Sequence, residues 1–303
     1  MKHWFTYPLI AHPYNPEFMT RDGIVRVAQA AEAAGFNGMG FTDHPAPSHK
    51  WLTAGGHDAL DPFVALAVVA TATERLLLIP NIVVLPYRTP FIVAKAAASL
   101  DVLSGGRFIL SVATGYLRSE YRALGVDFEQ RNVLFDEAVE VLRGVWSEER
   151  FSYQGTGFTA GEVTANPRPP HVPIWMGGNS ALTRRRVAAN GDGWNPFPAT
   201  ATLARTARTV PLEGIDDLIP MLDHLWAQVE AAGRERSQID IAFSTGLPGP
   251  ADSRFDARRE LEALDRLAAV GVTWTGITIP GTSIPDAIEA IERYGSEVIK
   301  AGA

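Results

Sequence analysis

The chain has 303 residues, of which 46% are hydrophobic and 20% charged, a composition typical of a globular protein with a large core. Its net charge of -7, with no basic stripe to offset it, argues against a protein that binds the nucleic-acid backbone. The sequence contains no cysteine, which excludes disulfides, thiolate catalysis and zinc–thiolate sites.

The seven histidines show neither HxH nor HExxH spacing, so the sequence predicts no dedicated metal site. The N-terminal segment lacks the pattern of a signal peptide, and no apolar run approaches membrane-spanning length. We therefore expect a cytoplasmic protein that acts on a small-molecule substrate, with no membrane and no nucleic acid among its partners.

Apolar segments of strand length alternate along the chain with segments of helical periodicity. The first predicted helix begins at Thr20, an N-cap residue type, and stops at Gly35, a C-cap type. The next begins at Asp61, an N-cap followed by proline at the first helical position. Later helices are predicted over 89–106, 132–149, 180–190, 215–232, 255–271 and 285–295. The predicted strands are 3–10, 36–42, 76–85, 107–115, 173–178, 192–197, 239–245 and 273–280.

Two segments interrupt this alternation. Residues 151–172 contain "YQGTGF" and "NPRPPHVP", which suggests a hairpin-like insertion with a proline-stiffened return. Residues 198–214 are ambiguous and fit either a mobile loop or a short helix over the barrel mouth.

Eight strand–helix units in about 300 residues predict a parallel sheet closed into a (β/α)8 TIM barrel, an α/β fold with one domain spanning 1–303. The alternative is an open doubly wound sheet, but the chain lacks a GxGxxG pattern after its first strand.

In a barrel of this kind, function lies at the C-terminal ends of the strands. Those positions are poor in carboxylates, and Asp43 is the only acid among them. This argues against a glycosidase, which needs two facing carboxylates, and against a metal-dependent hydrolase. Small residues, amides, hydroxyls and aromatics prevail instead, which suits a planar cofactor that carries its own reactivity.

The segment "MGGNSALTRRR" is the clearest candidate for anion binding. Gly177 and Gly178 leave backbone N–H groups exposed, and Asn179 or Ser180 can cap the helix that follows. An ordinary strand–helix turn explains the same residues. The usual barrel phosphate site follows strands seven and eight, so a site after the fifth strand is a departure.

The segment "GFTDHPAPSH" ends the second predicted strand. In the functional interpretation, His44 hydrogen-bonds to a reacting atom and Asp43 orients its ring. In the alternative interpretation, Asp43 and Pro45 merely form the turn that closes the strand. His49 and His57 are predicted to be solvated loop residues.

Three further side chains follow predicted strand ends. Trp51 lies in the same loop as His49, where it could cover a ligand or merely pack. Arg88 and Arg118 could each hold an anionic tail, although exposed arginines usually have no specific role.

The order of several motifs resembles the bacterial luciferase-like monooxygenase family, most closely the branch that uses the deazaflavin coenzyme F420. The motifs are "GFNGMGFTDH", "P-x-R-x-P" after the third strand, "S-G-G-R" before the fourth, and "GG-x-S" followed by "GDGW". The resemblance covers about residues 20–197 well, and the C-terminal third only in its strand–helix rhythm.

The resemblance implies a (β/α)8 barrel, usually a homodimer, that holds F420 or FMN at the C-terminal face. It implies that His44 lies beside the cofactor ring, and that a bulge with a non-prolyl cis peptide falls near Asn81–Ile82. The remaining residues that we assign to the cofactor site are Thr114, Gly115 and Tyr116 near the ring, Gly177, Gly178, Asn179 and Ser180 at the phosphate, and Trp194.

One position departs from the family pattern. Deazaflavin-dependent sugar-phosphate dehydrogenases carry a glutamate acid where this chain has Tyr116. With Tyr116, Trp51 and Phe197 near the mouth, we expect a different and more apolar substrate.

Three functions remain open from the sequence. The first is F420-dependent hydride transfer to or from an organic substrate, and the second is an FMN-dependent monooxygenase that uses reduced flavin and oxygen. The third is a non-catalytic barrel that only binds flavin.

Overall fold

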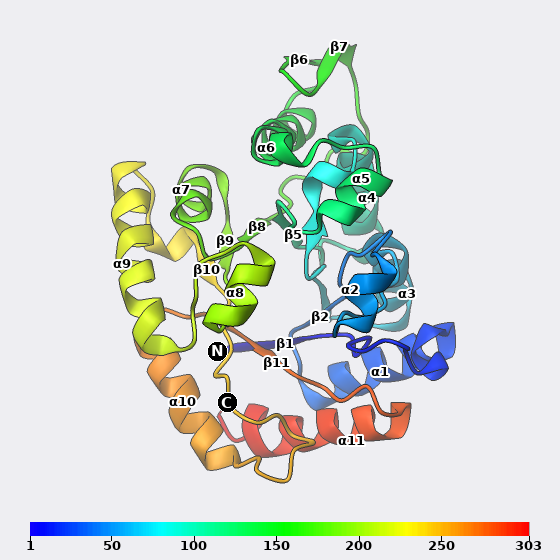
Figure 1. Ribbon diagram of the computed structural model, residues 1–303, viewed down its shortest axis with the longest axis vertical. Coiled ribbons are helices and arrows are strands. Elements are labelled where there is room, and N and C mark those ends of the chain that lie inside the picture. Colours follow the sequence, from blue (N-terminus) through cyan, green and yellow to red (C-terminus); the bar gives the residue numbers. More distant parts are fainter. Residues whose placement is uncertain (303) are drawn as a thin grey trace.

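The computed structural model describes residues 1–302 and has nine parallel strand segments surrounded by helices (Figure 1). The strands are β1 (Lys2–Thr6), β2 (Gly38–Gly40), β3 (Leu77–Leu78), β4 (Val83–Val84), β5 (Leu110–Ala113), β8 (Ile174–Gly177), β9 (Gly193–Asn195), β10 (Asp240–Ile241) and β11 (Trp274–Ile277). The main helices are α1 (Arg21–Ala34), α3 (Pro62–Ala72), α4 (Pro90–Ser104), α6 (Arg131–Ser147), α7 (Ala181–Asn190), α9 (Ile215–Ala231), α10 (Ala257–Ala269) and α11 (Ile284–Tyr294).

The strands pair in parallel in the order β11-β1-β2-β3 and β10-β9-β8-β5-β4. Two parallel bridges, Leu78 with Phe108 and Ala242 with Trp274, join the edges of these two sheets. β3 and β4 are the two halves of the predicted third strand, so pairing runs around eight strand positions. The predicted (β/α)8 fold is therefore confirmed, and the open-sheet alternative is wrong.

The ends of the first helices lie where their capping residues indicate. The Thr20 hydroxyl accepts the backbone N–H of Gly23, and Gly35 ends α1 with a left-handed φ of 95°. The Asp61 carboxylate accepts the N–H groups of Phe63 and Val64 at the start of α3.

Both ambiguous segments form regular structure. β6 (Phe151–Gln154) and β7 (Thr159–Val163) make an antiparallel hairpin, which projects beside α6 at the top of Figure 1. α8 (Ala201–Ala207) is the short helix that was one of the two expectations for 198–214. Two further short helices, α2 (His49–Thr53) and α5 (Arg118–Ala123), were not predicted.

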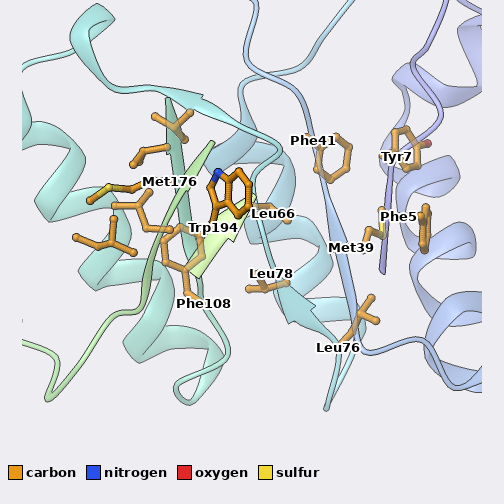
Figure 2. Packing of buried hydrophobic residues seen from close by; sticks show 14 of the residues in the cluster. Phe5, Tyr7, Met39, Phe41, Leu66, Leu76, Leu78, Phe108, Met176 and Trp194 are labelled. Carbon is orange, nitrogen blue, oxygen red and sulfur yellow. The ribbon is translucent and has the colours of Figure 1, made fainter. Parts of the chain in front are cut away.

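The core has two layers because alternate residues of each strand face opposite sides of the barrel wall. Trp4, Trp175 and Trp274 belong to the smaller buried cluster, with ring centroids 6.3 Å and 5.1 Å apart for neighbouring pairs. Neighbouring strand residues such as Phe5 and Met176 pack instead in the large cluster beneath the helices (Figure 2). Across residues 1–302, none of the helices combines the length and apolar character needed to cross a bilayer.

Candidate functional site

A cavity of about 520 Å³ lies at the C-terminal ends of the strands. Most of the predicted site residues line it: Asp43, His44, Asn81, Ile82, Thr114, Gly115, Tyr116, Gly177, Gly178 and Ser180. A volume of this size is typical of small-molecule and cofactor pockets.

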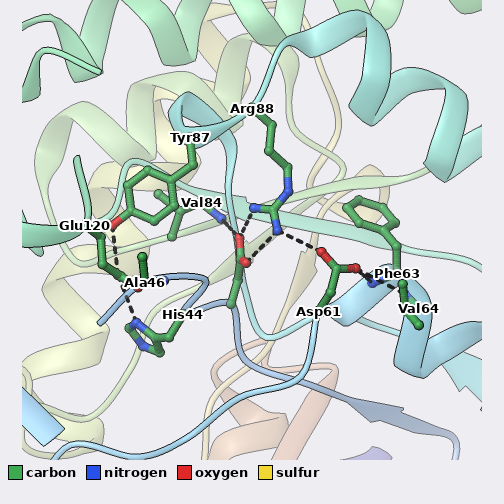
Figure 3. Close-up of polar contacts among 10 residues, drawn as sticks. His44, Ala46, Asp61, Phe63, Val64, Val84, Tyr87, Arg88 and Glu120 are labelled. Carbon is green, nitrogen blue, oxygen red and sulfur yellow. Dashed lines mark hydrogen bonds and ion pairs between the residues drawn. The ribbon is translucent and has the colours of Figure 1, made fainter. Parts of the chain in front are cut away.

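His44 is held by a buried glutamate that the sequence did not indicate. Its Nδ1 lies 3.1 Å from Oε2 of Glu120, a residue of α5 that is 1% exposed (Figure 3). The same carboxylate accepts the Tyr87 hydroxyl at 3.0 Å and the Ala46 backbone N–H at 3.2 Å. Because an ionised carboxylate only accepts hydrogen bonds, Nδ1 of His44 is the donor. Nε2 is then the ring nitrogen available to a ligand in the cavity.

Asp43 does not orient His44, so that expectation is wrong. Its carboxylate accepts a bidentate pair of hydrogen bonds from Arg88, at 2.5 and 2.8 Å, and a third from the Val84 backbone N–H at 2.9 Å. Arg88 also reaches Asp61 at 3.1 Å, as Figure 3 shows. Although burial lowers the pKa of Arg88, the hydrogen bond and charge of Asp43 raise it above its usual value. Arg88 therefore joins the strand ends internally, which argues against the possibility that it holds an anionic tail.

Three other rings lie close to the ring of His44. The rings of Trp51, His57 and Tyr116 have centroids 4.5, 5.0 and 6.5 Å from that of His44. His57 lines the cavity, and burial lowers its pKa below the usual value, so its prediction as a solvated residue is wrong. His49 is exposed, as expected.

The break between β3 and β4 forms part of the cavity wall. The Asn81–Ile82 peptide bond is cis, at the position that the family resemblance implied. The Asn81 side chain donates to the Thr6 hydroxyl at 2.7 Å and accepts from Asn195 at 3.2 Å. Gly177 faces this bulge, and a Cβ there would lie 2.1 Å from Cδ1 of Ile82. A side chain at position 177 would therefore require the end of the Ile82 side chain to move.

The loop 177–180 connects β8 to α7, and its residues have different roles. Gly178 has a φ of 117°, a left-handed conformation that favours glycine, and Ser180 caps α7 by accepting the Thr183 N–H. Asn179 is fully buried and donates its amide to the carbonyls of Phe197 and Val210, at 3.0 and 2.9 Å.

Trp194 is also fully buried, and its indole N–H donates to the Gly178 carbonyl at 2.9 Å. Asn179 and Trp194 thus lie behind the cavity wall and shape the loop. Unlike the other predicted residues of the cofactor site, these two do not line the cavity.

Basic residues also line the cavity. Arg131, Arg186 and Arg208 line it, and Arg186 forms an ion pair with Asp136 at 2.5 Å. Arg118 lies outside the lining, 2.6 Å from Glu129. Among residues 1–302, no cluster of three or more His, Cys, Asp or Glu side chains is placed to hold a metal ion.

Sequence reasoning missed Glu120 because it considered only positions directly at strand ends. Glu120 is four residues beyond Tyr116, in the first turn of a short helix. A signal was present: Glu120 belongs to "RSEYRALG", where Tyr121 is the neighbouring buried residue of α5. An acidic residue beside an apolar anchor on a helix after a barrel strand is a candidate for a buried carboxylate.

A barrel whose strand ends enclose a cavity lined by glycines, arginines and a carboxylate-held histidine is typical of an enzyme that acts on small molecules. The family model of luciferase-like monooxygenases matches residues 3–294, so the chain belongs to this family.

The relatives include proteins named for both cofactor types. The chain is 28% identical over 298 residues to F420-dependent glucose-6-phosphate dehydrogenase of Intrasporangium calvum, which covers 87% of this chain and 82% of that protein. It is 32% identical over 175 residues to FMNH2-dependent dimethylsulfone monooxygenase of Pseudomonas putida, covering 55% and 46%. The structure of monooxygenase RslO1 from Streptomyces bottropensis matches 100% of both chains with a TM-score of 0.82 at 19% identity. The protein is accordingly an oxidoreductase of this flavin- or deazaflavin-dependent family.

Proposed function

We propose that the protein transfers hydride between coenzyme F420 and a small, fairly apolar organic substrate. The observation that carries this proposal is the combination of residues that line one cavity: His44, held by buried Glu120, the glycine-rich loop 177–178, and three arginines. The relative named as F420-dependent, which aligns with most of the chain, supports the choice of coenzyme.

The residues present fit a flat ring with an anionic tail. At Gly115 and Gly177 a Cβ would lie 2.5 Å from Val84 and 2.1 Å from Ile82, so the two glycines let the strand ends pack closely against these side chains in the cavity wall. The ring end of the coenzyme would be held at Asn81–Ile82, Thr114, Gly115 and Tyr116. Its phosphate would be held at Gly177, Gly178 and Ser180, where the start of α7 favours negative charge.

The coenzyme, when bound, supplies or accepts the hydride, and the protein's own residues handle the proton. Nε2 of His44 accepts a proton from the substrate in one direction and returns it in the other. The Glu120 carboxylate keeps the ring in one tautomer and stabilises the imidazolium form. Glu120 is therefore a positioning residue. Burial raises the pKa of Tyr87, which keeps its hydroxyl a donor to Glu120.

Aromatic residues around His44 favour an apolar substrate. Tyr116 stands where sugar-phosphate dehydrogenases of the family carry an acid, and Trp51 packs against the His44 ring. Phe197 adds a further apolar side chain to the cavity lining. A sugar phosphate would find no acid at position 116, so we propose a different substrate from that in the relative's name.

Parallel titrations with F420 and FMN test the proposal, followed by turnover assays with a panel of alcohols, carbonyls and alkenes. We expect tight F420 binding, turnover of an apolar substrate, and a loss of turnover of about 100-fold or more in His44→Ala. Tight FMN binding without F420 affinity would reject the proposal. The FMN-dependent relative supports the alternative of a monooxygenase that uses reduced flavin and oxygen. Cofactor binding without turnover, and without an effect of His44→Ala, would identify a non-catalytic barrel.

We further propose that the protein is a cytoplasmic homodimer of single-domain subunits. Neighbouring helices α3 and α4 expose the large apolar side chains of Val64, Ile92 and Leu103, which are 70%, 66% and 82% exposed. Exposed apolar surface of this kind is typical of interaction sites. Light scattering on the purified protein measures the oligomeric state, and a monomer at micromolar concentration would contradict the proposal.

A further inference from the structure

Three arginines surround one buried aromatic ring beside the cavity. The guanidinium carbons of Arg118, Arg131 and Arg208 lie 4.1, 4.0 and 5.4 Å from the ring centroid of Phe128. Phe128 is 6% exposed and belongs to a small buried cluster between α5 and α6. The three arginines come from α5, α6 and the end of α8, so three separate elements converge on this ring.

The positive charge of this arginine cluster is only partly compensated. Glu129 pairs with Arg118 at 2.6 Å and approaches Arg131 at 3.8 Å. Arg208 forms no ion pair with any residue in 1–302. Three guanidinium groups against one carboxylate leave an excess of two positive charges, in a protein whose net charge is -7. Arg131 and Arg208 line the cavity, so this excess charge is accessible to a ligand inside it.

The backbone of Arg208 provides an independent observation. Arg208 is the C-cap of α8 and has a left-handed φ of 54°. It is the one non-glycine residue with positive φ in the described chain. Glycine adopts this conformation without penalty and is the usual residue at such a helix end. An arginine here is less favourable for the backbone, which points to a role for its side chain.

We propose that Arg131 and Arg208, packed around Phe128, form a second anion subsite beyond the 177–180 loop. Its ligand is the carboxylate-bearing extension of a polyanionic coenzyme. This inference rests on the proposed function and deepens it. F420 carries such an extension beyond its phosphate, whereas FMN ends at a single phosphate that the 177–180 loop alone would hold.

The test compares coenzyme affinity with stability in Arg208→Gly. For the purified full-length protein, F420 affinity should fall about tenfold, and its dependence on salt concentration should weaken. Affinity for the tail-less deazaflavin, which lacks the phosphate and carboxylates, should not change. The melting temperature should stay the same or rise, because glycine suits the left-handed C-cap. Arg208→Gln, which removes the charge but keeps a side chain, should weaken F420 binding to a similar extent.

Arg205→Gln is the matched control. Arg205 lies on the same helix, and within residues 1–302 its side chain forms a hydrogen bond only with Thr202. Equal F420 affinity in wild type and both Arg208 variants would overturn the subsite while leaving the proposed function intact. A wild-type protein that binds FMN but not F420 would overturn both. A fall in affinity for the tail-less deazaflavin as large as that for F420 would also overturn the subsite, since it would indicate a general distortion of the cavity.

Discussion

At the scale of single residues, the most consequential side chain is Glu120. It is buried at 1% exposure, yet its carboxylate accepts hydrogen bonds from a histidine, a tyrosine and a backbone amide. Burying a carboxylate is unfavourable unless its oxygens are hydrogen-bonded, and here each oxygen has a donor. These contacts hold His44, which lines the cavity, in one tautomer.

Glu120→Gln should reduce kcat/KM by about 10- to 100-fold, because the amide cannot stabilise the imidazolium form of His44. Coenzyme affinity should change little, since Glu120 lies behind His44. The dependence of kcat on pH should also change, which a purely structural role would not produce. Steady-state kinetics over a pH series measures both effects. Glu289→Gln, at an exposed position of α11, is the control, and an unaltered kcat and pH profile in Glu120→Gln would contradict the assignment.

His3 gives a prediction for stability against pH. Burial, with a smaller contribution from the N-terminal charge, lowers the pKa of His3 to about 4. In the unfolded chain the pKa is about 6.5, so between these values the unfolded state binds a proton that the folded state does not. The free energy of unfolding should therefore rise with pH from about 4 to about 6.5 and be constant above it. The contribution of His3 is at most about 3 kcal/mol.

Urea unfolding at pH 5, 6 and 7.5 measures this dependence. The variant His3→Gln, which does not titrate, should show a shallower increase in unfolding free energy than the wild type over this range. Equal slopes in the two proteins would show that His3 does not contribute.

At the scale of elements, the Asn179 side chain joins the flanks of the short helix α8 to the barrel. Asn179 donates to carbonyls on both sides of α8, at Phe197 and Val210, and accepts the Phe197 N–H at 3.1 Å. The ends of the segment also pair with each other through Ala199 and Leu212. The position of Arg208 in the cavity therefore depends on the 177–180 loop.

Asn179→Ala should destabilise the protein by about 1–3 kcal/mol, because the carbonyls of Phe197 and Val210 and the N–H of Phe197, which are only partly buried, lose their side-chain partner. Limited proteolysis within 198–210 should become faster than in the wild type. Asn179→Asp keeps the acceptor for Phe197 but loses both donors, so its effect should be of intermediate size. If Asn179→Ala were cleaved no faster than the wild type, contacts other than those of Asn179 would hold α8 in place.

At the scale of the whole molecule, Arg107 connects the helical layer to the barrel wall at the N-terminal side. Its guanidinium donates to the carbonyls of Ala70, Thr73, Leu76 and Ser104 and to the Thr73 hydroxyl. It lies next to the Leu78–Phe108 bridge that joins the two sheets. Residues at this face of a barrel contribute to stability and not to chemistry. Arg107 is the arginine of the "S-G-G-R" motif.

Arg107→Ala should lower the free energy of unfolding by about 3 kcal/mol or more, because hydrogen bonds from a charged donor are lost at several acceptors. The turnover number of the folded protein at low temperature should not change. Chemical denaturation and kinetics at 15–20 °C measure the two quantities. Arg150→Ala, at a 70% exposed ion pair, should cost less than about 1 kcal/mol and is the control. A loss no larger than that of the control would contradict this role.

The sequence alone determined the order and type of most elements. Local signals carry this information: strand and helix periodicities, the caps at Thr20 and Asp61, and glycine at the ends of α1 and α4. Because parallel strands place their C-terminal ends together, these signals also predicted that His44, Asn81, Thr114 and Gly177 would share one cavity. The short helices α2 and α5 lack enough residues for a clear period, which explains why they were missed.

Only the tertiary structure decided which partner each polar side chain takes. Glu120 and His44 are 76 residues apart in the sequence, and Arg88 and Asp43, which form an ion pair, are 45 residues apart. His57 is half-buried because its loop brings its ring to within 5.0 Å of the His44 ring. Such choices depend on distances of a few ångström between elements packed by their apolar faces, and no local pattern encodes those distances. The sequence thus determined where the site would lie, and the packing determined which residues position His44 within it.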